Sequence, residues 1–280
     1  MDYGKIAYVG GGNMTRALAG GMLAAGYEAS HVLISEPLAA HRESLATELP
    51  GAVVFEANED AVRDAECVVF AVKPQILCEV CKPLAAIVQR TRPLIISIAA
   101  GVRARDIESW LGGNLPVVRV MPNQPALLRL GISGLYANEH TTDHQLRAAT
   151  NIISTTGPVI QVGSEEDIDT VTAVSGTGPA YFYLLVDMLV KVAVDLGLSY
   201  EDALALVLET ARGAGEMAER SGETMDSLIA RVRSPGGTTA AAFDYLDGTD
   251  FRAIFTAAVV AARDRAVDLA DQAHEAGKEP

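Results

Sequence analysis

The segment Ser234–Thr239, which reads Ser-Pro-Gly-Gly-Thr-Thr, has the residue types and spacing best suited to binding a small anion. Its glycines, Gly236 and Gly237, allow the backbone to approach a ligand closely. Thr238 and Thr239 then offer N–H groups and hydroxyls at the expected start of a helix, where a carboxylate binds readily. An ordinary helix cap after a turn would use the same residues. The rest of the chain has to decide between these two interpretations.

A second candidate site is the loop Gly10–Thr15, which reads Gly-Gly-Gly-Asn-Met-Thr and lies between an expected strand and an expected helix. In a dinucleotide fingerprint, Gly10 permits the tight turn and Gly12 lets a pyrophosphate reach the helix N-terminus. Thr15 fills the third position, where glycine or alanine is usual, which leaves open how closely the helix packs on the strand. A structural loop without a ligand is the alternative. The position directly after the first strand favours a bound dinucleotide.

Glu36 ends the second expected strand, at a spacing from the glycines that suits contact with the adenosine ribose. A carboxylate there accepts hydrogen bonds from a ribose 2′-OH and repels a 2′-phosphate, which favours NADH over NADPH. Arg42 would instead favour NADPH if its side chain turned toward the 2′-phosphate. A solvated strand end without a ligand is the remaining alternative for Glu36.

Two later strand ends carry small or turn residues at the edge where open α/β sheets bind ligands. They are Ala71–Gln75 and Ser97–Gly101. Lys73, in the first of them, either offers its charge to the cofactor or is simply solvated.

A Rossmann-type α/β domain with a parallel sheet is predicted over residues 1–163. The runs Cys67–Val72 and Leu94–Ile98 are apolar throughout, a pattern typical of strands buried on both faces of a parallel sheet. The stretches between strands are long enough for crossover helices. The other expected strands are Lys5–Val9, Val32–Ser35, Val53–Phe55, Val117–Val120, Ile132–Ala137 and Pro158–Val162.

An all-α domain is predicted over residues 164–280, because strand patterns stop after Gly163. Pro179 suits the first position of a helix, and Gly197 suits its C-terminal cap. Further helices are expected to end near Ser221, to run from Thr224 to Arg233, to follow Gly237, and to run from Asp250 to about Ala276. Because these helices are apolar on more than one face, we expect a second copy of the chain to cover them in a homodimer.

The composition argues against several classes of function. The 280 residues carry a formal net charge of -14, which repels phosphate backbones and argues against a nucleic-acid partner. Three cysteines fit a reduced cytoplasm, and Cys78-x-x-Cys81 has no second pair or nearby histidine, so no metal is expected. No targeting segment or membrane span is expected, because the longest uncharged run is broken by glycine and proline.

Six motifs, in one order, resemble the pyrroline-5-carboxylate reductase family over nearly the whole chain. They are Gly10-Gly11-Gly12-Asn13-Met14, Ala71-Val72-Lys73-Pro74, Ala99-Ala100-Gly101-Val102, Arg119-Val120-Met121-Pro122-Asn123, Ser175-Gly176-Thr177-Gly178-Pro179-Ala180-Tyr181 and Ser234-Pro235-Gly236-Gly237-Thr238-Thr239. The last two are the most specific, because general Rossmann dehydrogenases lack them. Thr15 and Gln124 depart from the family pattern, and neither change removes a group that the chemistry needs.

The resemblance implies reduction of the imine of 1-pyrroline-5-carboxylate to proline by NADPH or NADH, and a helical domain that interlocks with a second subunit. Rings of dimers occur in the family. By motif, the cofactor would be lined by Gly10, Gly11, Gly12, Asn13, Met14, Glu36, Asn58, Val72, Lys73, Pro74, Ala99 and Ala100. The substrate would be held by Ser234, Gly237, Thr238 and Thr239, with Thr239 nearest the imine and as the catalytic residue. Glu165 lies in an acidic stretch that resembles part of the substrate pocket.

Imine reduction asks little of side chains as acids, because a protonated cyclic imine is already electrophilic. Surface positions are therefore expected for the histidines, which are His31, His41, His140, His144 and His274. A β-hydroxyacid dehydrogenase, the first alternative, needs a lysine base on its first interdomain helix, where only Lys191 stands. A non-catalytic NAD(P) sensor, the second alternative, would keep the glycine loop without needing Ser234–Thr239.

Overall fold

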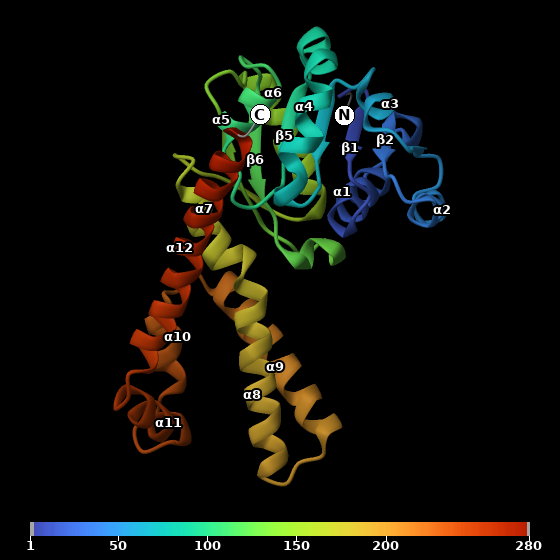
Figure 1. Cartoon of the computed structure of the whole chain (residues 1–280). Helices are drawn as coiled ribbons and strands as arrows, with labels where there is room; N and C mark the ends of the chain where they lie inside the picture. Colours follow the sequence, from blue (N-terminus) through green and yellow to red (C-terminus); the bar gives the residue numbers. More distant parts are fainter. Residues whose placement is uncertain (1–2, 279–280) are drawn as a thin grey trace. The chain divides into compact units, whose positions relative to one another are not determined.

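The computed structural model describes residues 3–278, and its first part is built on an eight-stranded sheet (Figure 1). In sheet order the strands are β3 (Val53–Phe55), β2 (Val32–Ser35), β1 (Ile6–Val9), β4 (Cys67–Phe70), β5 (Leu94–Ser97), β6 (Val117–Met121), β7 (Ser133–Ala137) and β8 (Val159–Gln161). Each predicted strand is present at or close to its expected bounds. The predicted Rossmann-type α/β class is therefore confirmed.

Two strands, β7 and β8, run opposite to the other six strands of the described sheet and so depart from the predicted parallel direction. β7 pairs antiparallel with β6, with Arg119 opposite Tyr136, whereas the other neighbouring strands of the described sheet pair parallel. A parallel return needs a crossover of a dozen or more residues, usually a helix. The link between β6 and β7 holds only the short 3₁₀ turn Gln124–Leu128, so the chain returns directly alongside β6.

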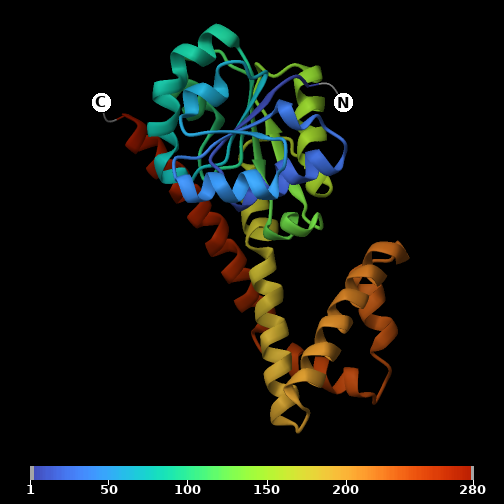
Figure 2. The same cartoon turned by 90° about the vertical axis from the view of Figure 1, so that its right-hand side faces the viewer.

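Both faces of the sheet are buried, as the apolar strands predicted. In β1, Ile6 and Tyr8 join one hydrophobic cluster, and Ala7 and Val9 join another. The first cluster includes residues of α1 (Asn13–Ala24), α2 (Ala39–Glu48) and α6 (Asp143–Ile153). The second includes residues of α3 (Asn58–Val62), α4 (Pro74–Thr91) and α5 (Ala104–Trp110). Figure 2 shows helices on the two sides of the sheet.

The chain after β8 is helical, as predicted. Its elements are α7 (Asp167–Val171), a π-helical turn (Thr172–Gly176), α8 (Gly178–Asp195), α9 (Tyr200–Ser221), α10 (Met225–Val232), α11 (Thr238–Asp247) and α12 (Phe251–Lys278). Ser199 and Thr224 cap the N-termini of α9 and α10 with their side chains. Gly197 follows α8 with a φ of 104°, a left-handed conformation that favours glycine after a helix.

The chain divides into two compact units. The sheet unit contains the residues up to Thr177 and the C-terminal part of the chain from Ala261, and the helical unit is Gly178–Val260. In the sheet unit, Ala266 and Ala270 of α12 are buried. The predicted boundary between residues 163 and 164 divides the sequence differently, because α7, the π turn and the end of α12 belong to the sheet unit. As a boundary between sequence domains, it stays a prediction.

Within the helical unit, α8 packs on α9 and leaves much of its apolar surface exposed. Val190 is 5% exposed, whereas Phe182 is 68% and Leu189 57% exposed. One helical stretch, Asp167–Asp195, is long and apolar enough to cross a membrane by length and composition alone. A single helix of this kind is weak support for a membrane span, because helices that pack on other protein surfaces pass the same test.

Candidate dinucleotide and carboxylate sites

The glycine loop makes a sharp turn between β1 and α1. Gly10 has a φ of 101°, a conformation that residues with side chains rarely adopt. A Cβ atom on Gly10 would lie 2.9 Å from Cγ1 of Val72 and 3.0 Å from the carbonyl oxygen of Ala71. Both neighbours follow β4, so glycine is required by the close approach of the two strand ends.

The N-terminus of α1 is open to a ligand. Gly12 is the N-cap residue, and no side chain caps this end of the helix. A Cβ atom on Gly12 would meet no atom within 4 Å. The unpaired N–H groups of the first turn and the positive end of the helix dipole therefore suit a pyrophosphate, and the loop fits a nicotinamide dinucleotide.

Thr15 fills the third fingerprint position with a function of its own. Its side chain is fully buried, and its hydroxyl donates a hydrogen bond to the carbonyl oxygen of Gly10. The hydroxyl thus ties the first turn of α1 to the turn that precedes it. This bond gives a buried threonine a hydrogen-bond partner at the position where the fingerprint usually has glycine or alanine.

Glu36 lies beside the glycine loop and is 8% exposed. Its carboxylate accepts hydrogen bonds from the N–H of Gly11 at 3.2 Å and the N–H of Leu38 at 3.0 Å. Nδ1 of His41 lies 3.6 Å from the same carboxylate. Because a carboxylate has about four acceptor positions, Glu36 keeps capacity for ribose hydroxyls.

Arg42, the residue that could reverse the cofactor preference, is held by other groups. Its Nη1 donates to the carbonyl oxygens of Glu36 and Pro37 at 3.0 and 2.7 Å. Its Nη2 pairs with Glu56 at 2.9 Å. A second arginine, Arg16, lines a cavity of about 350 Å³ beside the loop and pairs with Glu48.

The carboxyl ends of β1 and β4 meet at the switch point of the sheet. β2 and β3 extend the sheet on one side of β1, and β4, β5 and β6 extend it on the other. Open α/β sheets bind ligands at such a point. The predicted cofactor residues follow these strand ends: Gly10, Gly11, Gly12, Asn13 and Met14 follow β1, Glu36 follows β2, Asn58 follows β3, Val72, Lys73 and Pro74 follow β4, and Ala99 and Ala100 follow β5. The fold therefore gathers them along one edge, where Lys73 is exposed.

Glu165 lies in a cluster of ion pairs in the sheet unit. Its Oε1 accepts hydrogen bonds from Nη1 of Arg119 at 2.8 Å and from the N–H of Ala104 at 2.6 Å. Nearby, Arg103 pairs with Asp169 at 2.6 Å. Burial lowers the pKa of the Arg119 guanidinium, and the adjacent Glu165 carboxylate offsets only part of this effect. The cluster fastens the segment before α7 to β6 and α5, and the substrate role of Glu165 stays a prediction.

The segment Ser234–Thr239 forms a turn that leads into α11 in the helical unit. Gly236 has a φ of 72°, and the N–H of Gly237 donates to the carbonyl oxygen of Ser234 at 3.0 Å. Gly237 is the N-cap of α11, and no side chain caps this end. Among the described residues, the hydroxyls of Thr238 and Thr239 have no hydrogen-bond partner. Gly237 thus caps the helix after a turn, no threonine side chain takes part in the cap, and the substrate-binding role of the segment stays a prediction.

The base of this turn is fixed by Arg233. Its guanidinium pairs with Asp244 at 2.6 Å and with Asp247 at 3.0 Å, and it lies over the ring of Phe243. Hydrogen bonds to both carboxylates raise the pKa of Arg233. These contacts join the turn to the helix that follows it.

Sequence reasoning missed the role of a polar pair beside β6. Nδ2 of Asn123 donates to Oγ of Ser175 at 3.3 Å, and Oδ1 of Asn123 accepts from the N–H of Ile132 at 3.0 Å. Asn123 and Ser175 stand in two of the family motifs, but they are 52 positions apart. A spacing rule cannot join residues so distant in the sequence.

His274 is half-buried at the surface and also makes a contact with another element. Nδ1 of His274 lies 2.6 Å from Oδ1 of Asp106, whose side chain is 6% exposed. The pair joins α12 to α5 within the sheet unit. Its partners are 168 positions apart, so no local pattern could reveal it.

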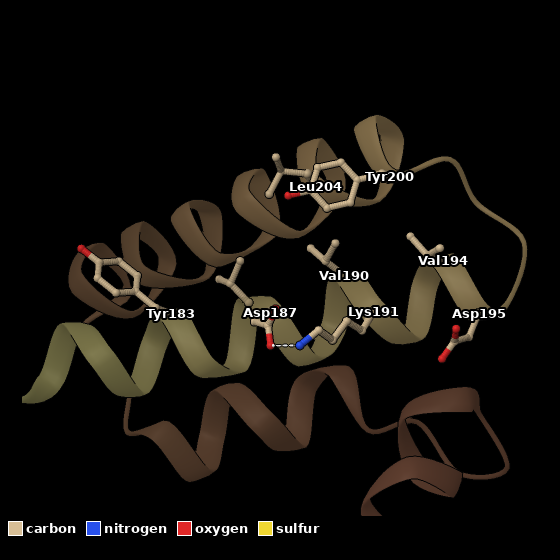
Figure 3. Close-up of a pocket in the computed structure, with 9 residues that line it drawn as sticks. Tyr183, Asp187, Val190, Lys191, Val194, Asp195, Tyr200 and Leu204 are labelled. Atoms are coloured by element: carbon tan, nitrogen blue, oxygen red, sulfur yellow. Dashed lines mark hydrogen bonds and ion pairs between the residues drawn. The ribbon is translucent and has the colours of Figure 1, made fainter.

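A groove of about 550 Å³ separates parts of α8 and α9, and Figure 3 shows the residues that line it. Nζ of Lys191 pairs there with Asp187 at 2.7 Å, one helical turn earlier, and its side chain is 72% exposed. The dehydrogenase alternative needs this lysine as a base. An exposed ion pair of this kind contributes little and is typical of a solvated helix face.

Within residues 3–278, no group of three or more His, Cys, Asp or Glu side chains is placed to hold a metal ion. Cys67, Cys78 and Cys81 are free thiols, and burial raises the pKa of Cys67 and Cys81.

A glycine loop at the switch point, an open helix N-terminus and a carboxylate after β2 define a Rossmann-type oxidoreductase that uses a nicotinamide dinucleotide. The chain is 44% identical to the pyrroline-5-carboxylate reductase of Pseudomonas aeruginosa, over 97% of this chain and 99% of that one. The chain belongs to the pyrroline-5-carboxylate reductase family.

Other comparisons agree with this assignment. A family model for pyrroline-5-carboxylate reductase dimerisation matches residues 165–269, and one for coenzyme F420-dependent NADP oxidoreductases matches residues 5–101. The solved structure of the Coxiella burnetii reductase has a TM-score of 0.90 at 36% identity, over 96% of this chain and 99% of that one. That of the Plasmodium falciparum enzyme, with NADP bound, has a TM-score of 0.86 at 29% identity, over 96% of this chain and 99% of that one.

Proposed function

We propose that this chain reduces the C=N bond of 1-pyrroline-5-carboxylate to give L-proline, the last step of proline biosynthesis. The single observation that carries the proposal is the Pro-Gly-Gly-Thr-Thr turn, which leads into a start of α11 that no side chain caps and where Thr238 and Thr239 offer N–H groups and hydroxyls. A glycine loop alone would suit any Rossmann dehydrogenase. The reduced nicotinamide, when bound, supplies a hydride to the imine carbon.

The cofactor is held along the carboxyl edge of the sheet. The N–H groups of Gly12, Asn13 and Met14 bind the pyrophosphate at the open end of α1. Glu36 accepts hydrogen bonds from the adenosine ribose, and Asn58 lies on the same side of the switch point. Val72, Lys73 and Pro74, after β4, and Ala99 and Ala100, after β5, line the other half of the site.

The substrate carboxylate is bound by the start of α11. Thr238 and Thr239 offer backbone N–H groups there, Gly237 lets the backbone approach the carboxylate, and Ser234 offers a hydroxyl. The chain carries a net charge of -14, so an anionic substrate needs a local positive site. The N-terminal end of a ten-residue helix supplies it without a charged side chain.

Thr239 acts at the imine nitrogen. Its hydroxyl orients the nitrogen, so that the ring is held with its C=N carbon toward the hydride donor. The nitrogen receives its proton from water or from Thr239, and the carbon receives the hydride. Glu165 is the substrate-binding candidate of the sheet unit, where its Oε1 accepts hydrogen bonds from Arg119 and Ala104.

The chain uses a nicotinamide dinucleotide, and we propose NADH as the better cofactor. The nearly buried carboxylate of Glu36 would repel a 2′-phosphate. Arg42 and Arg16, the cations that could offset this repulsion, each pair with a glutamate. The preference therefore depends on Glu36 and its two arginine neighbours.

The assembly is a homo-oligomer, in which we propose a dimer as the basic unit. The family model over residues 165–269 describes dimerisation, and the exposed apolar side chains of α8 supply the surface. Rings of dimers and a cytoplasmic location complete the proposal, and the free thiols fit a reducing compartment.

One assay tests the reaction. Purified chain is mixed with NADH or NADPH and 1-pyrroline-5-carboxylate, and loss of reduced cofactor and formation of proline are both measured. Equal amounts of cofactor lost and proline formed are expected. Cofactor binding without turnover would contradict the proposal and support the NAD(P) sensor. A parallel assay with NAD⁺ or NADP⁺ and a β-hydroxyacid tests the dehydrogenase, which reduction of the cofactor there and no turnover of the imine would support.

A further inference from the structure

The side chain of Asn123 has one defined orientation at the end of β6. The N–H of Ile132 can only donate, so the atom facing it at 3.0 Å is the amide oxygen of Asn123. The NH₂ group of Asn123 therefore faces Ser175, whose Oγ lies 3.3 Å away. As a result, Ser175 Oγ is an acceptor from Asn123, and its own proton is left to donate.

Ser175 stands on the π-helical turn Thr172–Gly176. The N–H and hydroxyl of Thr177 both donate to the carbonyl oxygen of Thr172, at 2.8 and 3.0 Å, which holds the turn. Gly176 lets the turn approach β6, since a Cβ there would overlap the side chain of Met121. Such turns re-aim side chains and are frequent at functional sites. Among the described residues, the Ser175 hydroxyl has no acceptor.

The pair lies at the edge of the sheet that binds the cofactor. Asn123 follows the carboxyl end of β6, and β6 is next to β5 and two strands from β4. A dinucleotide spans the switch point, with one nucleotide over each half of the sheet. Glu36 marks the adenosine half beside β2, so the nicotinamide half lies over β4, β5 and β6.

We propose that Ser175, oriented by Asn123, donates a hydrogen bond to the carboxamide oxygen of the nicotinamide. A neutral hydroxyl with an amide donor behind it suits a neutral carbonyl acceptor. The bond fixes the rotation of the ring and so the face from which hydride leaves. Ser175 touches the cofactor, and Asn123 is a positioning residue. The inference rests on the proposed reductase function for its catalytic meaning, but not for its test of binding.

The experiment compares two oxidised dinucleotides by calorimetry. One is the natural cofactor, and the other is its thionicotinamide analogue, in which sulfur replaces the carboxamide oxygen. Sulfur accepts a hydrogen bond poorly, so the wild-type chain should bind the analogue about three- to tenfold more weakly, the size of a neutral hydrogen bond. Ser175→Ala should bind the two equally.

Two more variants separate this role from folding. Asn123→Asp keeps the acceptor for Ile132 but places a carboxylate beside Ser175, so that the Ser175 hydroxyl donates to this carboxylate and not to the cofactor. The ratio of the dissociation constants of the two dinucleotides should then fall toward one. Thr172→Val is the matched control, because that hydroxyl donates only to the carbonyl oxygen of Ile168 at 2.8 Å. It should discriminate as the wild type does. Thermal melting establishes that each variant is folded.

The outcomes are distinct. A wild-type chain that does not discriminate, or Ser175→Ala and Asn123→Asp variants that both discriminate as wild type does, would overturn the inference. Weaker binding of both dinucleotides by Ser175→Ala, with discrimination kept, would place the hydroxyl elsewhere, such as on the ribose, and would also overturn it. If discrimination follows Ser175 but 1-pyrroline-5-carboxylate is not reduced, the proposed reaction fails and the cofactor contact stands.

Discussion

Thr239 lies in the first turn of α11, where its hydroxyl has no partner among the described residues. If this hydroxyl orients the imine nitrogen, it acts mainly in the transition state. Thr239→Val keeps the shape and removes only the hydroxyl, so kcat should fall about 10- to 100-fold, or about 1.4–3 kcal/mol. Steady-state kinetics measures the loss.

Binding of NAD(P)H alone should not change in this variant, because the nucleotide is held by the loop at Gly10–Met14. Thr249→Val is a control in the helical unit, because that hydroxyl acts only within its own turn, donating to the carbonyl oxygen of Leu246 and accepting from the N–H of Phe251 at 3.4 Å. A Thr239→Val variant with near-normal kcat would show that the turn binds the carboxylate through its backbone and that water delivers the proton.

Glu36 gives the second prediction at this scale. Glu36→Gln removes the charge and keeps an acceptor for the N–H of Gly11 or Leu38. Relief of the repulsion should improve kcat/KM for NADPH relative to NADH by about 1–2 kcal/mol, the scale of one charged contact.

The neighbouring ion pair supplies a comparison. Glu56→Gln should release Arg42 from its ion pair at 2.9 Å. With Glu36 intact, kcat/KM for NADPH relative to NADH should then rise as well. An unchanged cofactor ratio in Glu36→Gln would mean that its carboxylate serves only to cap the glycine loop.

Single residues could be predicted from the sequence where a backbone rule applies. Gly10 was assigned to a tight turn, and its left-handed φ agrees. The buried hydroxyl of Thr15 was not foreseen, because the fingerprint describes only which residues fit. The pairing of Arg42 with Glu56 and of His274 with Asp106 depends on tertiary packing, which no local pattern contains.

At the scale of elements, the strands could be predicted closely because runs such as Cys67–Phe70 are apolar throughout and end at turn residues. The antiparallel direction of β7, which β8 shares, was missed because it depends on the absence of a helix in the link from β6. The π turn was missed for a related reason. The N–H of Thr177 donates to the carbonyl oxygen of Thr172, five residues earlier, whereas an α-helix bonds residues four apart. Hydrophobic periodicity is too coarse to show this difference of one residue.

The ion-pair cluster that holds α7 and α5 to β6 gives a prediction about elements. Glu165→Leu leaves the guanidinium of Arg119, which is 2% exposed, without its closest partner. Loss of one member of a buried pair costs about 3–5 kcal/mol. Adding Arg119→Met should recover much of that loss, because an apolar side chain then replaces the buried charge. Urea unfolding of the single and double variants measures both changes.

Arg63→Ala breaks an exposed pair with Asp60 and should cost less than about 1 kcal/mol, which sets the surface reference. A Glu165→Leu variant as stable as this reference would show that the cluster does not fasten the elements. A separate Glu165→Gln variant tests the substrate role: an unchanged KM for 1-pyrroline-5-carboxylate would remove Glu165 from the pocket.

At the scale of the whole molecule, the sequence predicts that the helices of one chain need a second protein surface to cover their apolar faces. Helices apolar on several faces require a second surface, and α8 indeed buries few of its large side chains within the chain. The compact units could not be predicted from the sequence, because the return of α12 to the sheet unit depends on contacts such as Leu269 with Gly101. Periodicity predicts a helix but not the surface on which it packs.

The oligomer itself is the last prediction. Leu189 is 57% exposed on α8, and a carboxylate placed there would be buried in the proposed dimer interface without a partner. Leu189→Glu should weaken association by several kcal/mol, on the order of 100-fold or more, and give a monomer at micromolar concentration where the wild type is at least a dimer. Light scattering coupled to size exclusion measures the mass. Ile160→Glu, at an equally exposed position on β8 of the sheet unit, is the control and should keep the wild-type mass. A wild-type mass of one chain would refute the dimer, and a dimeric Leu189→Glu would place the interface on a different surface.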